Sequence, residues 1–201
     1  MSISKQDMLK LVKELRARTD AGVKECKAVL TETGGDIDKA VTILREKGIA
    51  KADSRSGRST KEGVIGCYLH REKIVGLVEL TCETDFVART DLFKNLAKEL
   101  AIQVVTSSPQ TISREELSPE YIEQERAIFK KLEKESGKPD KIIDKIVEGK
   151  LEKLYREVCL LEQDYYKDDS KTVDQMVKEA IAKLGENIEV KRIFRMQVGE
   201  S

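Results

Sequence analysis

The chain has 201 residues, of which 39% are hydrophobic, 37% are charged and only 4% are aromatic. This composition is typical of a soluble, helix-rich protein with a modest hydrophobic core and a densely charged surface. Lys+Arg and Asp+Glu both number 37, so the formal net charge is zero. Because proteins that hold nucleic acid through its phosphates normally carry a basic excess, we do not expect a nucleic-acid partner.

Cysteine and histidine usage argues against a metal centre and against disulfides. The only histidine is His70, and no C-x-x-C pair occurs among the four cysteines, Cys26, Cys67, Cys82 and Cys159. A zinc site needs clustered thiolates or imidazoles, so we expect no metal and no cofactor. Scattered thiols fit a reducing cytosol better than a disulfide framework.

The beginning of the chain does not read as a targeting segment. Residues 1–15 include the acidic Asp7 and Glu14 and no apolar stretch of the kind found in signal peptides. No apolar run approaches the roughly 20 residues that span a bilayer. We therefore expect a cytoplasmic protein with no membrane partner.

Residues 1–50 predict three short helices that pack on one another. Each has apolar residues at helical spacing: Met8, Leu11, Val12 and Leu15 in the first, Val23, Cys26, Val29 and Leu30 in the second, and Ile37, Ala40, Val41 and Leu44 in the third. Asp20 and Asp36 are candidate caps of the second and third helices. Gly34-Gly35 ends the second helix and Gly48 stops the third. This pattern predicts a compact three-helix module.

Residues 51–63, KADSRSGRSTKEG, contain no apolar side chain larger than alanine. Small and charged residues do not offset the entropy lost on ordering, so we interpret this segment as a linker. An alternative is that its basic residues, Lys51, Arg55, Arg58 and Lys61, touch RNA, but a solvated tether is the simpler interpretation.

Residues 64–201 predict an α+β core, an antiparallel sheet packed with helices. Two strand-like runs, 64–69 and 74–82, predict a hairpin, and a helix follows with apolar residues from Leu92 to Val104. Further helices are predicted over 119–135, 140–161 and 172–184. A closing strand over 188–198 can pair with the hairpin.

The sequence contains no phosphate-binding loop, dinucleotide fingerprint, zinc-protease motif or nucleophile elbow. Glu83 and Asp85 could be imagined as an acid/base pair or a magnesium site. Two carboxylates at the end of a strand are far more often capping or solvated groups. We therefore predict a binding protein and not an enzyme.

Four segments resemble the elongation factor Ts family, and they occur in the family's order over almost the whole chain. They are 9–30 with 34–36 and 44–48, then 83–89 (ETDFVAR), then 137–139 with 146–150 and 157–163, and finally 168–173 with 185–188 and Phe194. Any one segment alone would be a weak match, but together they are specific.

The resemblance implies a ubiquitin-associated-like fold for the first module and a guanine-nucleotide exchange factor for elongation factor Tu. It implies that Thr84, Asp85, Phe86 and Val87 reach elongation factor Tu and dislodge its magnesium, with Phe86 entering an apolar pocket. The chain is similar to the short form with a single core, and short forms pair as homodimers. A long apolar stripe from Ile142 to Val158 also favours a homodimer held by the core.

By the same resemblance, Lys13, Arg16 and Val23 dock the first module on the nucleotide domain of elongation factor Tu. Two further positions are weaker candidates for partner contact. Lys24 stands where an apolar residue is common in the family, and Gln103 stands where some members place a histidine.

Without the family resemblance, the main candidate residues have simpler interpretations. Phe86 reads as a core phenylalanine under the next helix, Lys13 and Arg16 as an ordinary charged helix face, and Val23 as a core valine. The rival function is a non-enzymatic adaptor that binds peptides or ubiquitin-like partners through the three-helix module.

Overall fold

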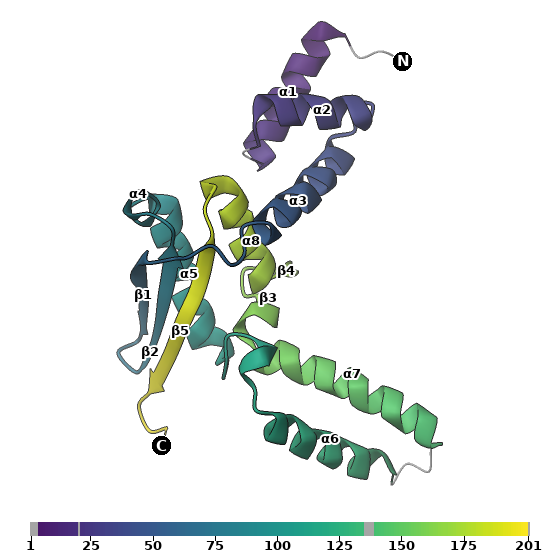
Figure 1. Cartoon of the computed structure of the whole chain (residues 1–201), viewed down its shortest axis with the longest axis vertical. Helices are drawn as coiled ribbons and strands as arrows, with labels where there is room; N and C mark the ends of the chain where they lie inside the picture. The colour runs from purple at the N-terminus through teal and green to yellow at the C-terminus, as the bar shows by residue number, and fades with distance from the viewer. Residues whose placement is uncertain (1–3, 20, 135–138, 201) are drawn as a thin grey trace. The chain divides into compact units, whose positions relative to one another are not determined.

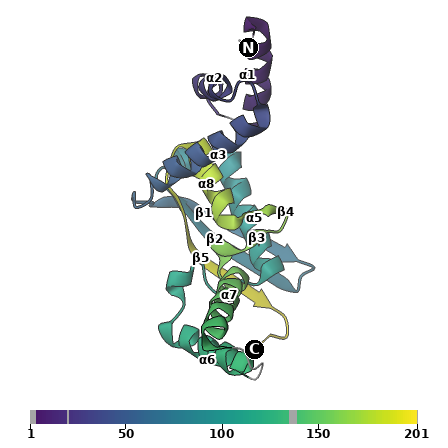
Figure 2. The ribbon, with the colours of Figure 1, turned by 90° about the vertical axis from the view of Figure 1, so that its right-hand side faces the viewer.

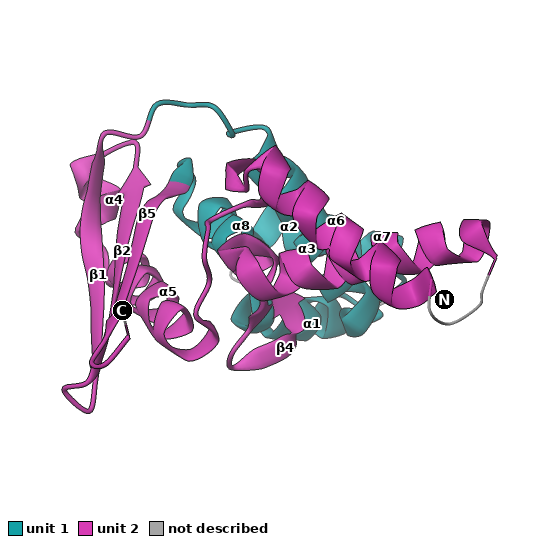
Figure 3. Ribbon diagram, turned by 90° about the horizontal axis from the view of Figure 1, so that it is seen from below, with its two compact units in different colours: residues 1–59, 177–188 teal, residues 60–176, 189–201 magenta. Residues whose placement is uncertain are grey.

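A computed structural model describes residues 4–19, 21–134 and 139–200 (Figure 1). The chain divides into two compact units, residues 1–59 with 177–188 and residues 60–176 with 189–201 (Figure 3). Three helices at the N-terminus are followed by an antiparallel sheet packed with helices, which confirms the α+β fold class. No helix among the described residues combines the length and the apolar character needed to cross a membrane.

The first unit contains α1 (Lys5–Thr19), α2 (Val23–Glu32) and α3 (Ile37–Asp53), and each contacts the other two. The predicted stripes supply the buried core, which consists of Val12, Leu15, Cys26, Val29, Leu30, Ala40 and Leu44. After α2, Gly34 and Gly35 adopt φ angles of +63° and +89°, which favour glycine. The predicted cap of α3 is also confirmed, because the Asp36 side chain accepts a hydrogen bond from the Lys39 amide at 3.1 Å.

Two details of the first unit differ from the sequence interpretation. Asp20, the predicted cap of α2, lies outside the described residues, and the position directly before α2 is Gly22. The predicted stop of α3 at Gly48 is wrong, because α3 continues to Asp53. A glycine inside a helix costs only about 1 kcal/mol relative to alanine, which packing elsewhere can offset.

Contacts with residues 177–188 supply that packing within the first unit. These residues include most of α8 (Val173–Leu184). Arg45 pairs with Glu179 at 3.1 Å, and Lys178 pairs with Asp53 at 2.9 Å. A Cβ added at Gly48 would lie 3.4 Å from the Cβ of Ala182, so this glycine sits where the two helices approach closely.

The segment predicted as a linker begins with the last turn of α3 and ends inside the first strand. Only residues 54–61 lie outside helix and strand. The carbonyl of Arg58 accepts a hydrogen bond from the Asn187 side-chain amide at 2.9 Å, within the first unit.

The second unit is built on a three-stranded antiparallel sheet of order β1-β2-β5, comprising β1 (Glu62–His70), β2 (Ile74–Cys82) and β5 (Ile188–Gln197). β1 and β2 form the predicted hairpin, with Glu62 opposite Cys82 and His70 opposite Ile74. β5 runs antiparallel to β2, since the Val198 amide donates to the Lys73 carbonyl at 2.9 Å and the Thr81 side-chain hydroxyl donates to the Glu189 carbonyl at 3.3 Å. The predicted pairing of the closing strand with the hairpin is confirmed.

Helix α5 (Asp91–Ser107) packs on one face of this sheet. Gly66 and Gly76 make the close approach possible, because a Cβ at either position would collide with the carbonyl oxygen of Ala97 or Ala101. The buried core between helix and sheet includes Val78, Leu80, Cys82, Phe93, Leu96, Leu100 and Val104. This core anchors both elements that flank the candidate site.

The opposite face of the sheet exposes apolar side chains. Ile65 alternates with the inward-facing Gly66, so it points away from α5, and its cross-strand neighbour Glu79 shares that face. Arg192 of β5 bonds Glu79 at 2.5 Å, which places every second residue of β5 on the same face. The large hydrophobic residues of this open sheet face are Ile65, Leu69, Phe194 and Met196, each more than half exposed.

Helices α6 (Pro119–Lys134) and α7 (Asp140–Val158) lie side by side as an antiparallel pair (Figures 1 and 2). Their own hydrophobic cluster has Ile143, Val147 and Leu151 fully buried against Ile122, Phe129, Leu154 and Tyr155. The apolar stripe of α7 is therefore largely used within the chain. It no longer argues for a dimer interface.

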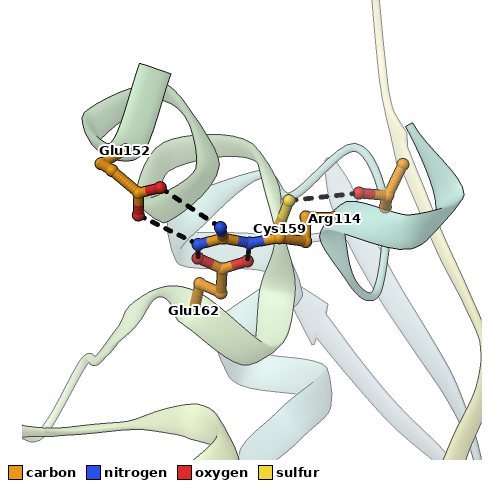
Figure 4. A network of polar contacts seen from close by, with 5 residues as sticks. Arg114, Glu152, Cys159 and Glu162 are labelled. Atoms are coloured by element: carbon orange, nitrogen blue, oxygen red, sulfur yellow. Dashed lines mark hydrogen bonds and ion pairs between the residues drawn. The ribbon is translucent and has the colours of Figure 1, made fainter. Parts of the chain in front are cut away.

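Arg114, which precedes α6, is bonded to Glu152 in α7 and to Glu162 in the short turn after α7 (Figure 4). Its guanidinium bonds both carboxylate oxygens of Glu162, at 2.7 and 2.6 Å, and both of Glu152, at 3.2 and 3.1 Å. Hydrogen bonds from Glu162 and Glu152 raise the pKa of Arg114. Beside this cluster the Thr111 hydroxyl donates to the Cys159 sulfur at 3.6 Å.

A short hairpin of β3 (Asp164–Tyr165) and β4 (Asp168–Thr172), which the sequence did not predict, is tied to α5 through Glu99. The Glu99 carboxylate accepts hydrogen bonds from the hydroxyls of Tyr165 and Tyr166, both at 2.7 Å, and from Lys167 at 2.6 Å. Burial would raise the pKa of Glu99, but the bonds from Lys167, Tyr166 and Tyr165 outweigh it, and the pKa is lowered.

Candidate functional site

The segment between β2 and α5 contains a one-turn helix, α4 (Asp85–Ala88), that presents Phe86 to solvent. Phe86 is 79% exposed, the highest value for any large hydrophobic side chain in the described part of the chain. The core position that the residues alone favoured for Phe86 is therefore wrong. An exposed phenylalanine on a short, defined turn is a candidate contact for a protein partner.

The N-terminal side of this turn is held by Thr84 and by the end of β2. The Thr84 hydroxyl accepts a hydrogen bond from the Val87 amide at 3.5 Å, as an N-cap. The Thr84 carbonyl accepts bonds from the Ala88 amide and from the thiol of Cys82, both at 3.2 Å. Cys82 is fully buried, so the turn starts from a fixed point in the core.

The C-terminal side is held by Thr90, a residue that the sequence analysis did not single out. Its amide and its hydroxyl both donate to the Val87 carbonyl, at 3.0 and 2.8 Å. Its hydroxyl oxygen also accepts from the amide of Phe93 at 3.3 Å, which makes Thr90 the N-cap of α5. A threonine directly before an aspartate and an apolar helical pattern is a sequence signal that could have indicated this cap.

The polar residues of the turn form an ion pair along it. Asp85 and Arg89 are paired at 2.9 Å in i,i+4 spacing, and both side chains are substantially exposed. Within the described residues, no three His, Cys, Asp or Glu side chains gather in a way that could hold a metal ion. The turn thus offers a projecting aromatic ring beside an exposed ion pair.

The first unit carries the other set of predicted contact residues. Lys13 and Arg16 are exposed on α1, while Val12 and Leu15 beside them in sequence are buried in the helical core. Val23, the first residue of α2, is 52% exposed, so the interpretation of Val23 as a core residue is wrong. Lys24 is exposed as well. The docking face is defined here as Lys13, Arg16, Val23 and Lys24.

Gln103 lies inside the second unit and is fully buried. Its amide nitrogen donates to the Ser107 hydroxyl at 3.0 Å, and to the Gln163 side chain and the Asp164 carbonyl at 3.1 Å. Its oxygen accepts from the Tyr166 amide at 2.9 Å. These bonds join α5 to the β3–β4 hairpin, so we leave Gln103 out of the proposed contact surfaces. Its i+3 spacing from the core residue Leu100 could have indicated burial.

A comparison with protein families identifies a match over residues 6–200 to the family described as Elongation factor TS. The chain belongs to the elongation factor Ts family. This confirms the resemblance read from the four segments, and the matched range includes both α4 and the docking face.

Relatives named Elongation factor Ts cover nearly the whole chain. The protein from Fervidobacterium nodosum is 51% identical over 201 residues, which is 100% of both chains. Those from Thermosipho melanesiensis and Coprothermobacter proteolyticus are each 52% identical, covering 95% and 94% of this chain and 98% and 97% of their own length. Membership of the elongation factor Ts family places the chain among translation elongation factors.

Proposed function

We propose that this protein is a guanine-nucleotide exchange factor that binds elongation factor Tu in the cytoplasm and promotes the release of GDP. The observation that carries the proposal is Phe86, an exposed aromatic ring on a hydrogen-bonded turn in a member of the elongation factor Ts family. The protein makes and breaks no covalent bond in this role and needs no cofactor of its own.

Exchange follows from differential binding. A protein that binds the nucleotide-free partner more tightly than the GDP-loaded partner must lower the partner's affinity for GDP by the same ratio. Burying a phenylalanine contributes on the order of 1.5–3 kcal/mol, and Phe86 has most of its surface still to bury. If that burial is available only in the empty partner, it drives GDP release.

We expect the exchange factor to act on the magnesium ion bound by its partner, because magnesium requires near-ideal octahedral coordination. A small displacement of the partner's magnesium ligands by residues Thr84, Asp85, Phe86 and Val87 would weaken the binding of the ion and of the nucleotide together. In this proposal Phe86 supplies the binding energy, and the fixed turn sets the direction in which it is applied.

The docking face acts separately from Phe86. Lys13 and Arg16 present exposed positive charge, which speeds encounter with an acidic surface and contributes at the rim of an interface. Val23 offers apolar area that is half exposed in the free protein. We propose that this face docks on the nucleotide domain of elongation factor Tu.

We also propose that two copies pair through the open sheet face. Ile65, Leu69, Phe194 and Met196 form an apolar surface on one side of the sheet, of the kind that homodimer interfaces bury. The cross-strand pair of Glu79 and Arg192 lies on the same face and can act as a polar rim. This surface replaces the α7 stripe as the reason to expect a dimer held by the core.

Loss of fluorescent GDP from elongation factor Tu, with and without the full chain, tests the exchange function. We expect a large acceleration at equimolar protein. An adaptor that binds other partners through α1, α2 and α3 would leave the rate of GDP loss unchanged, and that result would refute the proposal.

Sedimentation of the full chain tests the dimer. We expect a dimer at micromolar concentration that Phe194→Glu converts to a monomer, because a buried unpaired carboxylate is costly. Ile128→Glu is the matched control, since Ile128 is similarly exposed but lies on α6. A monomeric wild-type protein at tens of micromolar would refute the pairing.

A further inference from the structure

We infer that Thr90 is a positioning residue for Phe86: its hydroxyl couples the turn that presents the ring to the buried start of α5. The inference rests on the proposed exchange function and adds to it a residue outside the segment Thr84–Val87. Thr90 acts through Val87 and α5, and no contact between its side chain and the partner is required.

Helix α4 needs outside support because it is only four residues long. Nucleating a helical turn is unfavourable by itself, and a single turn gains few of the bonds that propagate a longer helix. Its stability must therefore come from what holds its two ends. Cys82 and Thr84 hold the first end, and Thr90 holds the second.

The Thr90 hydroxyl does two things at one oxygen atom. It donates to the Val87 carbonyl at 2.8 Å, and it accepts from the Phe93 amide at 3.3 Å. Phe93 is fully buried, as is Leu100 two turns further along the same face of α5, so the start of α5 is supported by the core. The hydroxyl thus links the Val87 carbonyl, one residue after Phe86, to a helix whose buried side chains pack against the sheet.

This link matters for exchange because a projecting ring is useful only if it points in one direction. If α4 frayed, binding would have to order its backbone again, and each residue ordered would cost conformational entropy. That cost would be subtracted from the energy available to displace magnesium. A residue that keeps the turn formed in the free protein therefore raises the exchange rate without touching the partner.

The test is loss of fluorescent GDP from elongation factor Tu driven by wild type, Thr90→Val and Thr90→Ser. Valine keeps the shape of threonine but has no hydroxyl, and serine restores the hydroxyl. Loss of a helix cap is commonly enough to change an equilibrium about fivefold, so we expect exchange about fivefold slower with Thr90→Val. We expect Thr90→Ser to stay within about twofold of wild type.

Ser118→Ala is the matched control for stability. The Ser118 hydroxyl accepts from the Tyr121 amide at 3.1 Å, so this variant removes an N-cap from α6 in the same unit, away from α4. We expect a similar fall in melting temperature and an unchanged exchange rate. Thr90→Val exchanging at the wild-type rate, or Ser118→Ala slowing exchange as much as Thr90→Val, would overturn the inference.

Amide hydrogen exchange of the wild-type chain tests the inference without any variant. The amides of Ala88, Arg89 and Thr90 donate to carbonyls of Thr84, Asp85 and Val87, and they should exchange far more slowly than in an unstructured chain. Unprotected amides would overturn the inference even if Thr90→Val failed to fold. A wild-type protein that leaves GDP release unchanged would instead refute the proposed function itself, whatever the variants do.

Discussion

The turn at Phe86 and the docking face on α1 and α2 present their exposed residues in different ways. Phe86 stands on a turn whose two ends are hydrogen-bonded to a buried strand end and a buried helix start. Lys13 and Arg16 are long charged side chains on a regular helix surface. Apolar burial needs a fixed geometry, whereas charge acts over roughly 8–10 Å of solvent and tolerates motion. The two surfaces therefore suit different steps of the proposed exchange: the turn suits displacement of magnesium, and the docking face suits encounter with the partner.

The largest expected effect comes from removing the ring. Phe86→Ala should slow GDP release at least tenfold, about 1.4 kcal/mol, because in the proposed mechanism the ring supplies the energy that displaces magnesium. Binding to nucleotide-free elongation factor Tu should weaken as well, since reciprocity couples the two effects. Fluorescent GDP release and a binding titration measure both.

Thermal unfolding provides the control for Phe86→Ala. At 79% exposure the ring contributes little to the fold, so the melting temperature should change little. A buried phenylalanine would cost roughly 3–5 kcal/mol on truncation to alanine. A stable variant that still exchanges normally would remove Phe86 from the mechanism.

The second largest effect is expected at Glu99, and it tests whether the rest of α5 supports the fold without taking part in exchange. Glu99→Gln keeps the shape of the side chain but removes the charge that accepts bonds from Tyr165, Tyr166 and Lys167. After a discount for solvent screening, we expect a loss of about 1 kcal/mol in the free energy of unfolding at pH 7. Chemical denaturation measures this loss, and the exchange rate should stay within about twofold of wild type.

The pH dependence of this loss has a definite sign. The pKa of Glu99 is lowered in the folded protein, so its contribution is present above the pKa of the unfolded chain, roughly 4.3. The contribution disappears as the pH falls through the folded pKa. The difference between wild type and Glu99→Gln should therefore shrink below about pH 4. A difference that is constant from pH 7 to pH 3 would show that the charge is not responsible.

The length of an element and the distance to its partners explain what could be predicted from the sequence. Periodicity predicted the three N-terminal stripes, the hairpin, the closing strand and most helix bounds, because each of these elements is long enough to repeat its pattern. Helix α4 is too short to show a period, so Phe86 could be placed on the surface only through the family resemblance. The continuation of α3 past Gly48 depends on contacts with residues 177–188, far along the chain.

Buried polar residues were the other point where the sequence was insufficient. Gln103 is buried because it bonds Gln163 and Asp164, which are sixty and sixty-one residues further along the chain, and a polar residue in a helix gives no local signal of such partners. Thr90 does carry a local capping signal. Its second bond, back to Val87, depends on a turn that the sequence did not predict.

A smaller effect should come from the charges of the docking face. Lys13→Ala combined with Arg16→Ala should weaken binding to elongation factor Tu by about three- to tenfold at low salt, mainly through slower association. The loss should diminish as salt rises, because exposed charges are screened. Association kinetics at several salt concentrations measure it.

The matched control for this double variant is Lys141→Ala with Lys145→Ala. It also removes two exposed positive charges, but from α7. Its association rate should match wild type at every salt concentration. If both double variants slow association equally, then net charge and not the docking face accounts for the effect.

The smallest effect should come from Val23, and its dependence on salt separates the two kinds of contact within one face. Val23 is half exposed in the free protein, so Val23→Ala removes two methyl groups that docking would only partly bury. We expect about 0.5 kcal/mol, or a little over twofold weaker binding. Because the lost contact is apolar, the loss of affinity should be the same at low and high salt and should appear as faster dissociation.

Surface plasmon resonance with nucleotide-free elongation factor Tu at two salt concentrations resolves the association and dissociation rates. A Val23→Ala effect that vanishes with salt would mean that the substitution acts by disturbing the neighbouring charges, and that Val23 itself makes no contact.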